Sequence, residues 1–392
     1  MAVKMHFNYK DVPRAARFGF SAKKIYVQFL GLLVGTILYS IFAYIGFLAS
    51  GYSITEVWDT FHYVPIPIGE PLTFWGYVFL YTGLALFVIV EFLFGVAISK
   101  ITYEQLKGDE FYEIKKALKF AFTEGRAAIF TPITIILVII FILLGGVVLG
   151  LIGKIPWVGE LVLLLMSVPV VFTVVFIVYL FFALILAYYL VAPIVAVTNS
   201  DTFDALFELF STLNDQNWRF VAYEAFLYVI KPIAFGIFAW AIAKGLYIAH
   251  WVLSAGWLMG DKYVKIEKAA LSYLPSHPAL YVFEPVLRVI GATPLLYPQP
   301  VANLTVPEAI VGFLFGILLY FIIFVALSYW GAIHWAGNTL IFVVLAKKKD
   351  DINYLEVKEE EEGFEETFEE ESEGTQEEGS EEEKEETGES ES

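Results

Sequence analysis

Six long apolar stretches constrain this chain more than any other feature of its sequence. A helix that crosses about 30 Å of hydrocarbon needs roughly 20 apolar residues, because each residue adds about 1.5 Å. Hydrophobic residues make up 58% of the chain and charged residues 17%, which is outside the range of soluble domains. The sequence therefore predicts an all-α, polytopic transmembrane helix bundle within residues 1–349. The spans are predicted near residues 25–50, 72–98, 127–152, 161–197, 218–256 and 307–346.

The last three stretches are longer than one crossing requires, so tilt, kinks or protrusion must absorb the excess. Proline removes a helical hydrogen bond, which makes Pro169, Pro193 and Pro232 the expected kink points. The segment GAIHWAGN at 331–338 is a further place where the sixth stretch is expected to divide.

The net charge of −17 belongs to the C-terminal segment. Residues 350–392 hold 22 acidic residues against two lysines, whereas the preceding residues are slightly basic. Such a segment cannot bury enough apolar surface to fold, so a disordered acidic tail is predicted. The tail either solvates the chain or binds a basic cytosolic partner.

The distribution of Lys and Arg predicts the orientation, because basic residues resist translocation. Residues 1–24 and 99–126 carry six each, whereas the loop at 51–71 carries none. Both termini are therefore predicted in the cytoplasm, and the protein in a prokaryotic-type inner membrane. The loop at 257–306 then lies outside, where its Pro-rich, apolar sequence favours a cap or re-entrant element and an external partner.

The sequence contains no cysteine, which excludes disulfides, thiolate metal sites and cysteine nucleophiles. With only five Gln and seven Asn, the composition also favours a thermophilic source.

Three octapeptides suggest an internal repeat: RAARFGFS at 14–21, KALKFAFT at 116–123 and DALFELFS at 204–211. Each is predicted to form an amphipathic helix in the membrane interface, and each precedes a hairpin of two spans. Three such units are expected to pack around a shared centre. The alternative is that Ala- and Phe-rich helices match one another by composition alone.

Two interfacial segments carry a resemblance to a known family. They are IKKALKFAFTEGR at 114–126 and the segment at 193–219, where a span ends at Pro193 and an amphipathic helix leads into an aromatic-rich span. Over roughly half of its length the chain resembles the membrane domain attached to some glycerophosphodiester phosphodiesterases, and related multi-pass proteins. It carries no phosphodiesterase domain, so the resemblance implies an architecture and no activity.

Ionisable residues inside the predicted spans are the candidate functional residues. Each costs about 2.5–3.5 kcal/mol on insertion scales, so each requires a partner or a function. Glu91, Glu224 and Lys231 form the candidate cluster, in which either or both carboxylates neutralise Lys231. The alternative is that the carboxylates reach the interface and Lys231 is a structural pair. Lys244 is expected to snorkel to the surface.

The histidines show no ligand spacing, so no metal or cofactor is predicted. His250 and His334 each precede a tryptophan, which is typical of anchoring at the membrane interface. Asn338 is expected to cap a helix or bond between helices.

No HExxH, GxSxG, paired aspartate or nucleotide-loop motif occurs, so no enzymatic activity is predicted. The favoured function is a membrane scaffold or assembly factor, with lipids as partners and no nucleic acid. The alternative is a transporter or channel for a small solute or lipid that uses the Glu/Lys cluster. A polar cavity touching Lys231 would favour transport, and a packed apolar centre would favour the scaffold.

Overall fold

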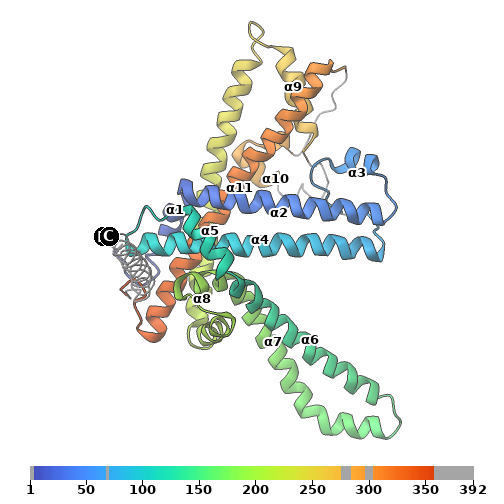
Figure 1. The fold of residues 1–392 in the computed structure, drawn as a ribbon, viewed down its shortest axis with the longest axis vertical. Coiled ribbons are helices and arrows are strands. Elements are labelled where there is room, and N and C mark those ends of the chain that lie inside the picture. The colour runs from blue at the N-terminus through green and yellow to red at the C-terminus, as the bar shows by residue number, and fades with distance from the viewer. Residues whose placement is uncertain (1–3, 68–69, 275–283, 296–302, 357–392) are drawn as a thin grey trace, which may run out of the picture. The chain divides into compact units, whose positions relative to one another are not determined.

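The computed structural model describes residues 4–67, 70–274, 284–295 and 303–356, and this part of the chain is helical without a β-strand. Six helices are long and apolar enough to cross a membrane, which confirms the predicted all-α polytopic bundle (Figure 1). The long helices are α2 (Ala22–Ala49), α4 (Phe74–Lys107), α6 (Arg126–Ile152), α7 (Val158–Thr198), α8 (Thr202–Leu253) and α11 (Val306–Asp350). The short ones are α1 (Arg14–Gly19), α3 (Ile54–Phe61), α5 (Ile114–Thr123), α9 (Asp261–Ser272), α10 (Glu284–Ile290) and the 3-10 helix η2 (Thr293–Leu295).

Residues 331–338 do not divide the last helix, so that prediction is wrong: α11 is continuous. Its small residues serve close packing instead. A Cβ atom at Gly331 would lie 2.5 Å from Cδ of Gln28, and one at Gly337 would lie 2.7 Å from a methyl group of Leu227. The glycines therefore admit neighbouring side chains while the helical hydrogen bonds persist. In α8 the residue with non-helical backbone is Gln216, at φ −127° and ψ 17°, and the helix continues through Pro232.

The side chains are most deeply buried at one end of the bundle, which we call the hub. It consists of α1, α5, residues 92–106 of α4, 180–197 of α7 and 328–346 of α11. Helix α1 lies directly on α11, because a Cβ atom at Gly19 would be 2.8 Å from the backbone of Ile333. The hydroxyl of Tyr329 also donates to the carbonyl of Ala16 at 3.1 Å. The first and last helices of the membrane domain therefore meet.

The three octapeptides bury the same two positions. The second residue is a fully buried alanine in each copy, and the sixth residue is buried in each copy as well. These pairs are Ala15 and Gly19, Ala117 and Ala121, and Ala205 and Leu209. A spacing of four residues places each pair on one helical face. Each octapeptide thus packs into the bundle through the same two positions, and the repeat itself stays a prediction.

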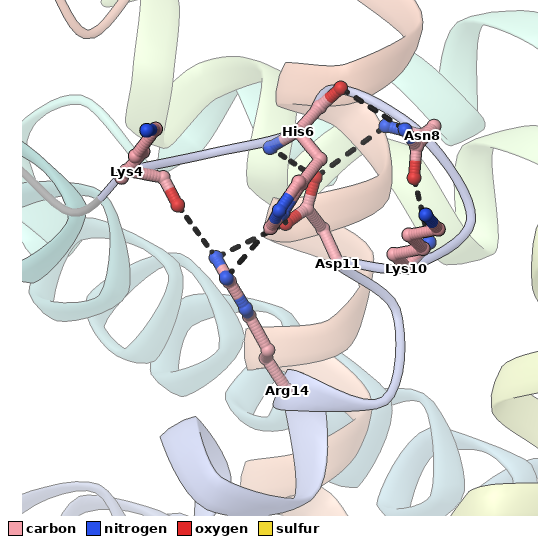
Figure 2. A network of polar contacts seen from close by, with 6 residues as sticks. All are labelled: Lys4, His6, Asn8, Lys10, Asp11 and Arg14. Atoms are coloured by element: carbon pink, nitrogen blue, oxygen red, sulfur yellow. Dashed lines mark hydrogen bonds and ion pairs between the residues drawn. The ribbon is translucent and has the colours of Figure 1, made fainter.

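A polar network fixes the segment before α1 (Figure 2). The fully buried carboxylate of Asp11 accepts a hydrogen bond from the backbone N–H of His6 at 2.9 Å. It also pairs with the guanidinium of Arg14 at 3.0 Å, and Arg14 donates to the carbonyl of Lys4 at 2.8 Å. One of the basic residues that predicted the orientation is therefore neutralised within the fold.

At the opposite end of α11, small residues admit α9. A Cβ atom at Gly312 would lie 2.7 Å from that of Ala269, and one at Gly316 would lie 3.2 Å from Tyr273. Glycines four residues apart permit such close helix packing. Tyr63, which follows α3, donates to the carbonyl of Phe313 at 3.2 Å. Burial and the nearby Tyr273 raise the pKa of Tyr63 to about 12, so the hydroxyl stays a donor in neutral solution.

The α6–α7 hairpin is the least buried part of the bundle. Between Ile140 and Tyr179 only Gly159 is buried among the residues that the structure describes. The predicted disorder of the tail lies outside the described residues from 357 onward, as do residues 275–283 and 296–302 of the predicted outer cap.

Candidate intramembrane binding site

Lys231 lies in the interior of the bundle, with only 7% of its surface exposed. Its Nζ is 3.4 Å from Nδ1 of His334 on α11 and 4.7 Å from the centre of the Trp330 ring. Within the described part of the chain no ion pair joins it to Glu91 or Glu224. The ammonium group is therefore held by an imidazole nitrogen and an aromatic face.

The prediction that His334 anchors its helix at the membrane interface is wrong. The histidine is 6% exposed and lies in the buried centre instead. Its Nδ1 faces the amide nitrogen of Asn338 at 3.1 Å as well as Lys231. Since both neighbours are donors, Nδ1 is the acceptor, and the ring hydrogen is on Nε2. That Nε2 atom is buried and has no hydrogen-bond partner.

Glu91 on α4 is paired with Gln28 on α2. The amide nitrogen of Gln28 donates to Oε2 of Glu91 at 2.7 Å. The other oxygen of each side chain is buried, and neither has a hydrogen-bond partner. Two unsatisfied acceptors therefore lie side by side on the α2–α4 side of the site.

Glu224 is close enough to Lys231 for their charges to interact. It also interacts with Tyr188 on α7, which is a common neighbour of Glu91 and Glu224. One carboxylate oxygen of Glu224 is buried without a partner. Of the predicted cluster, Glu91 and Lys231 line one pocket together with Tyr188.

A pocket of about 320 Å³ lies among these groups and is called the polar pocket below. Its polar lining is Gln28, Glu91, Lys231 and His334, with Glu224 outside the lining. Aromatic rings cover much of the remainder, from Phe87, Phe92, Tyr188, Trp330 and Trp335. Because α2, α4, α7, α8 and α11 all contribute, the pocket joins helices of all three predicted hairpins.

Sequence reasoning missed Gln28, Tyr188 and Trp330 as members of this site. The spacing of His334 and Asn338, four residues apart in α11, was the one available signal, since it places two polar side chains on one helical face. Asn338 bonds within its own helix, to the ring and the carbonyl of His334. His250 contacts Glu267 on α9 at 2.6 Å, which links α8 to α9.

No protein-family model, curated protein or solved structure matches this chain. The resemblance to the membrane domain of glycerophosphodiester phosphodiesterases stays a prediction. The side chains of the site supply both hydrogen-bond donors and acceptors. Lys231 and Nε2 of His334 offer hydrogen-bond donors from α8 and α11, whereas Gln28 and Glu91 offer acceptors from α2 and α4.

Proposed function

We propose that this protein is a transporter that binds a small polar solute or a lipid headgroup in the polar pocket. The observation that supports the proposal is the pocket itself, which is lined by a lysine without an ion pair and by two side chains that each carry an unsatisfied acceptor. A membrane scaffold would instead be expected to have a centre packed with apolar side chains.

The energetic cost of these groups supports a functional role. A buried polar atom without a partner costs about 1–3 kcal/mol, and a charged group costs more. Three such atoms occur in residues that line the polar pocket, Gln28, Glu91 and His334. A bound polar molecule would supply the missing partners, whereas a purely structural centre gains nothing from them.

The position of the pocket also suits transport. Its acceptors belong to the α2–α4 pair and its donors to α8 and α11, so a shift between these helices changes the pocket. Polar sites between helical units that move against each other are the usual arrangement in secondary transporters.

The test uses two matched lysine substitutions in α8. Lys231→Met removes the donor from the polar pocket, and Lys244→Met makes the same change at an exposed position beside Tyr247. Protein purified from native membranes in mild detergent is analysed by mass spectrometry for bound solutes and lipids. A compound that co-purifies with the wild type and with Lys244→Met, and is lost from Lys231→Met, supports the proposal. Uptake of that compound into proteoliposomes then measures transport.

Equal binding by all three proteins, or no bound compound in any of them, contradicts the proposal. A correctly folded Lys231→Met variant is verified by size-exclusion chromatography. Glu91→Gln provides a second test, because it preserves the bond from Gln28 while it removes the negative charge. Its matched control is Glu124→Gln, at an exposed position between α5 and α6.

A scaffold is the second candidate, and the exposed α6–α7 hairpin favours it. A hairpin with almost no buried residues offers apolar surface to lipid or to a partner. Because the chain has no cysteine, a single cysteine at Leu164 or Phe172 is a unique attachment point for a crosslinker. Capture of one defined membrane protein at these positions, and not at Tyr26 on α2, would favour the scaffold.

A further inference from the structure

The occupant of the polar pocket can be defined further. Resting on the proposed function, we infer that the ligand is a phospholipid whose headgroup combines a phosphate with a hydrogen-bond donor. The headgroup occupies the polar pocket, and the acyl chains lie in two apolar pockets beside it.

The first apolar pocket adjoins the polar pocket directly. It has a volume of about 480 Å³, lies between α4, α6 and α7, and shares Val88, Phe92 and Tyr188 with the polar pocket. The rest of its lining is almost entirely hydrocarbon, including Ala85 and Ile133. A molecule that fills both pockets must therefore be polar at one end and apolar at the other.

The second apolar pocket lies along α2 and α11, two helices that also line the polar pocket. Its volume is about 580 Å³, and its lining includes Leu33 on α2 and Phe324 on α11. The polar pocket is lined by Leu32 and Leu327 on the same two helices, one residue and one turn away. One apolar pocket thus adjoins the polar pocket and a second lies close to it on α2 and α11, so that each can take one of the two acyl chains of a phospholipid.

The polar side chains determine the headgroup. Lys231 and Nε2 of His334 are donors and suit the oxygens of a phosphate. The free oxygens of Gln28 and Glu91 are acceptors and suit the N–H groups of a primary ammonium or a hydroxyl. A phosphoethanolamine or phosphoglycerol headgroup satisfies both sides. A phosphocholine headgroup has no N–H or O–H group for the acceptors.

A free zwitterion of the same chemistry would satisfy the polar pocket alone, so the experiment separates the two sources. Ala85→Trp places an indole in the first apolar pocket without removing any polar group of the site. Ala241→Trp, at an exposed position of α8 outside these three pockets, is its matched control. Ala85→Phe is a smaller second variant. The probes are phosphatidylethanolamine, phosphatidylcholine and free phosphoethanolamine, and binding to detergent-purified protein is measured by native mass spectrometry.

We expect the wild type and Ala241→Trp to bind phosphatidylethanolamine about tenfold more tightly than phosphatidylcholine, a difference near 1.4 kcal/mol. Ala85→Trp and Ala85→Phe should weaken phosphatidylethanolamine binding by a similar factor. Lys231→Met should weaken the binding of both lipids, because the phosphate that Lys231 binds is common to them.

Two outcomes overturn the inference and leave the proposed function in place. One is tight binding of free phosphoethanolamine that Ala85→Trp does not change while Lys231→Met abolishes it. The other is equal affinity for phosphatidylethanolamine and phosphatidylcholine in a wild type that still requires Lys231. If Lys231→Met changes the binding of no probe, both the inference and the proposed function fail.

Discussion

The ammonium nitrogen of Lys231 on α8 lies 3.4 Å from Nδ1 of His334 on α11. A buried charge is thus placed beside a neutral acceptor instead of a carboxylate. In a membrane protein that arrangement costs stability, and it is consistent with a ligand that completes the site.

Replacement of Lys231 by methionine should stabilise the ligand-free protein. The substitution removes a buried cation that has no ion pair and keeps a side chain of similar length, so a gain on the order of 1 kcal/mol or more is expected. Thermal unfolding in detergent, monitored by circular dichroism, measures it. Lys244→Met should leave the melting temperature nearly unchanged. A clear loss of stability in Lys231→Met would show that the lysine is a structural element of the bundle.

Gly95 should tolerate no larger residue. A Cβ atom there would lie 2.6 Å from the indole ring of Trp335, which is packed in the hub. Gly95→Ala should therefore destabilise the protein by about 1–3 kcal/mol. The control is Gly236→Ala in α8, where no atom lies within 4 Å of the added methyl group. Higher helix propensity should make that variant as stable as the wild type or more so. Equal melting temperatures for both variants would contradict the close packing of α4 on α11.

The ion pair between Lys349 and Glu208 should hold the end of α11 against the start of α8. The ammonium lies 2.7 and 2.8 Å from the two carboxylate oxygens, and the lysine side chain is 3% exposed. Glu208→Gln or Lys349→Met alone should cost about 1–3 kcal/mol, and the double variant should cost less than the sum. Lys348→Met, at an exposed position, is the control. Additive losses in thermal unfolding would argue against direct coupling.

The stability of α3 should depend on pH. Glu56 accepts a hydrogen bond from the backbone N–H of Ser53 at 2.8 Å, and bonds from Ser53 lower the pKa of Glu56 below its usual range. A depressed folded-state pKa contributes stability above the unfolded value of about 4.3, and that stability is lost as the pH falls through the folded value.

Hydrogen exchange of the α3 amides, corrected for the intrinsic rate, measures this effect. Protection should fall between about pH 6 and pH 3 in the wild type. Glu56→Gln should be less protected at the higher pH and should change little on acidification. Full protection of wild-type α3 at the lower pH would disprove the role of this cap.

The sequence predicted the spans well because length and apolar character alone determine whether a helix can cross a membrane. It also selected Lys231 and Glu91, because ionisable groups in apolar stretches are few. It did not find Gln28 or Trp330, whose roles depend on how α2 and α11 rotate against their neighbours. Helix rotation is set by packing between helices far apart in the chain, and apolar periodicity does not encode it when every face is apolar.

The error on His334 has the same origin. A histidine beside a tryptophan is typical of the membrane interface, and the flanking residues gave no sign that α7 and α8 would enclose it. The prediction that 331–338 divide α11 failed because glycines that weaken an isolated helix also permit the close approach of Gln28 and Leu227.

The contact of α1 with α11 has a consequence for biosynthesis. Helix α1 can pack against α11 only after α11 has been synthesised, and five long helices precede α11 in the chain. Until then Lys231 lacks the imidazole and the indole that α11 provides. A nascent chain that stops before residue 328 therefore leaves Lys231 without these two neighbours inside the bilayer. Synthesis of the last helix completes the surroundings of this buried lysine.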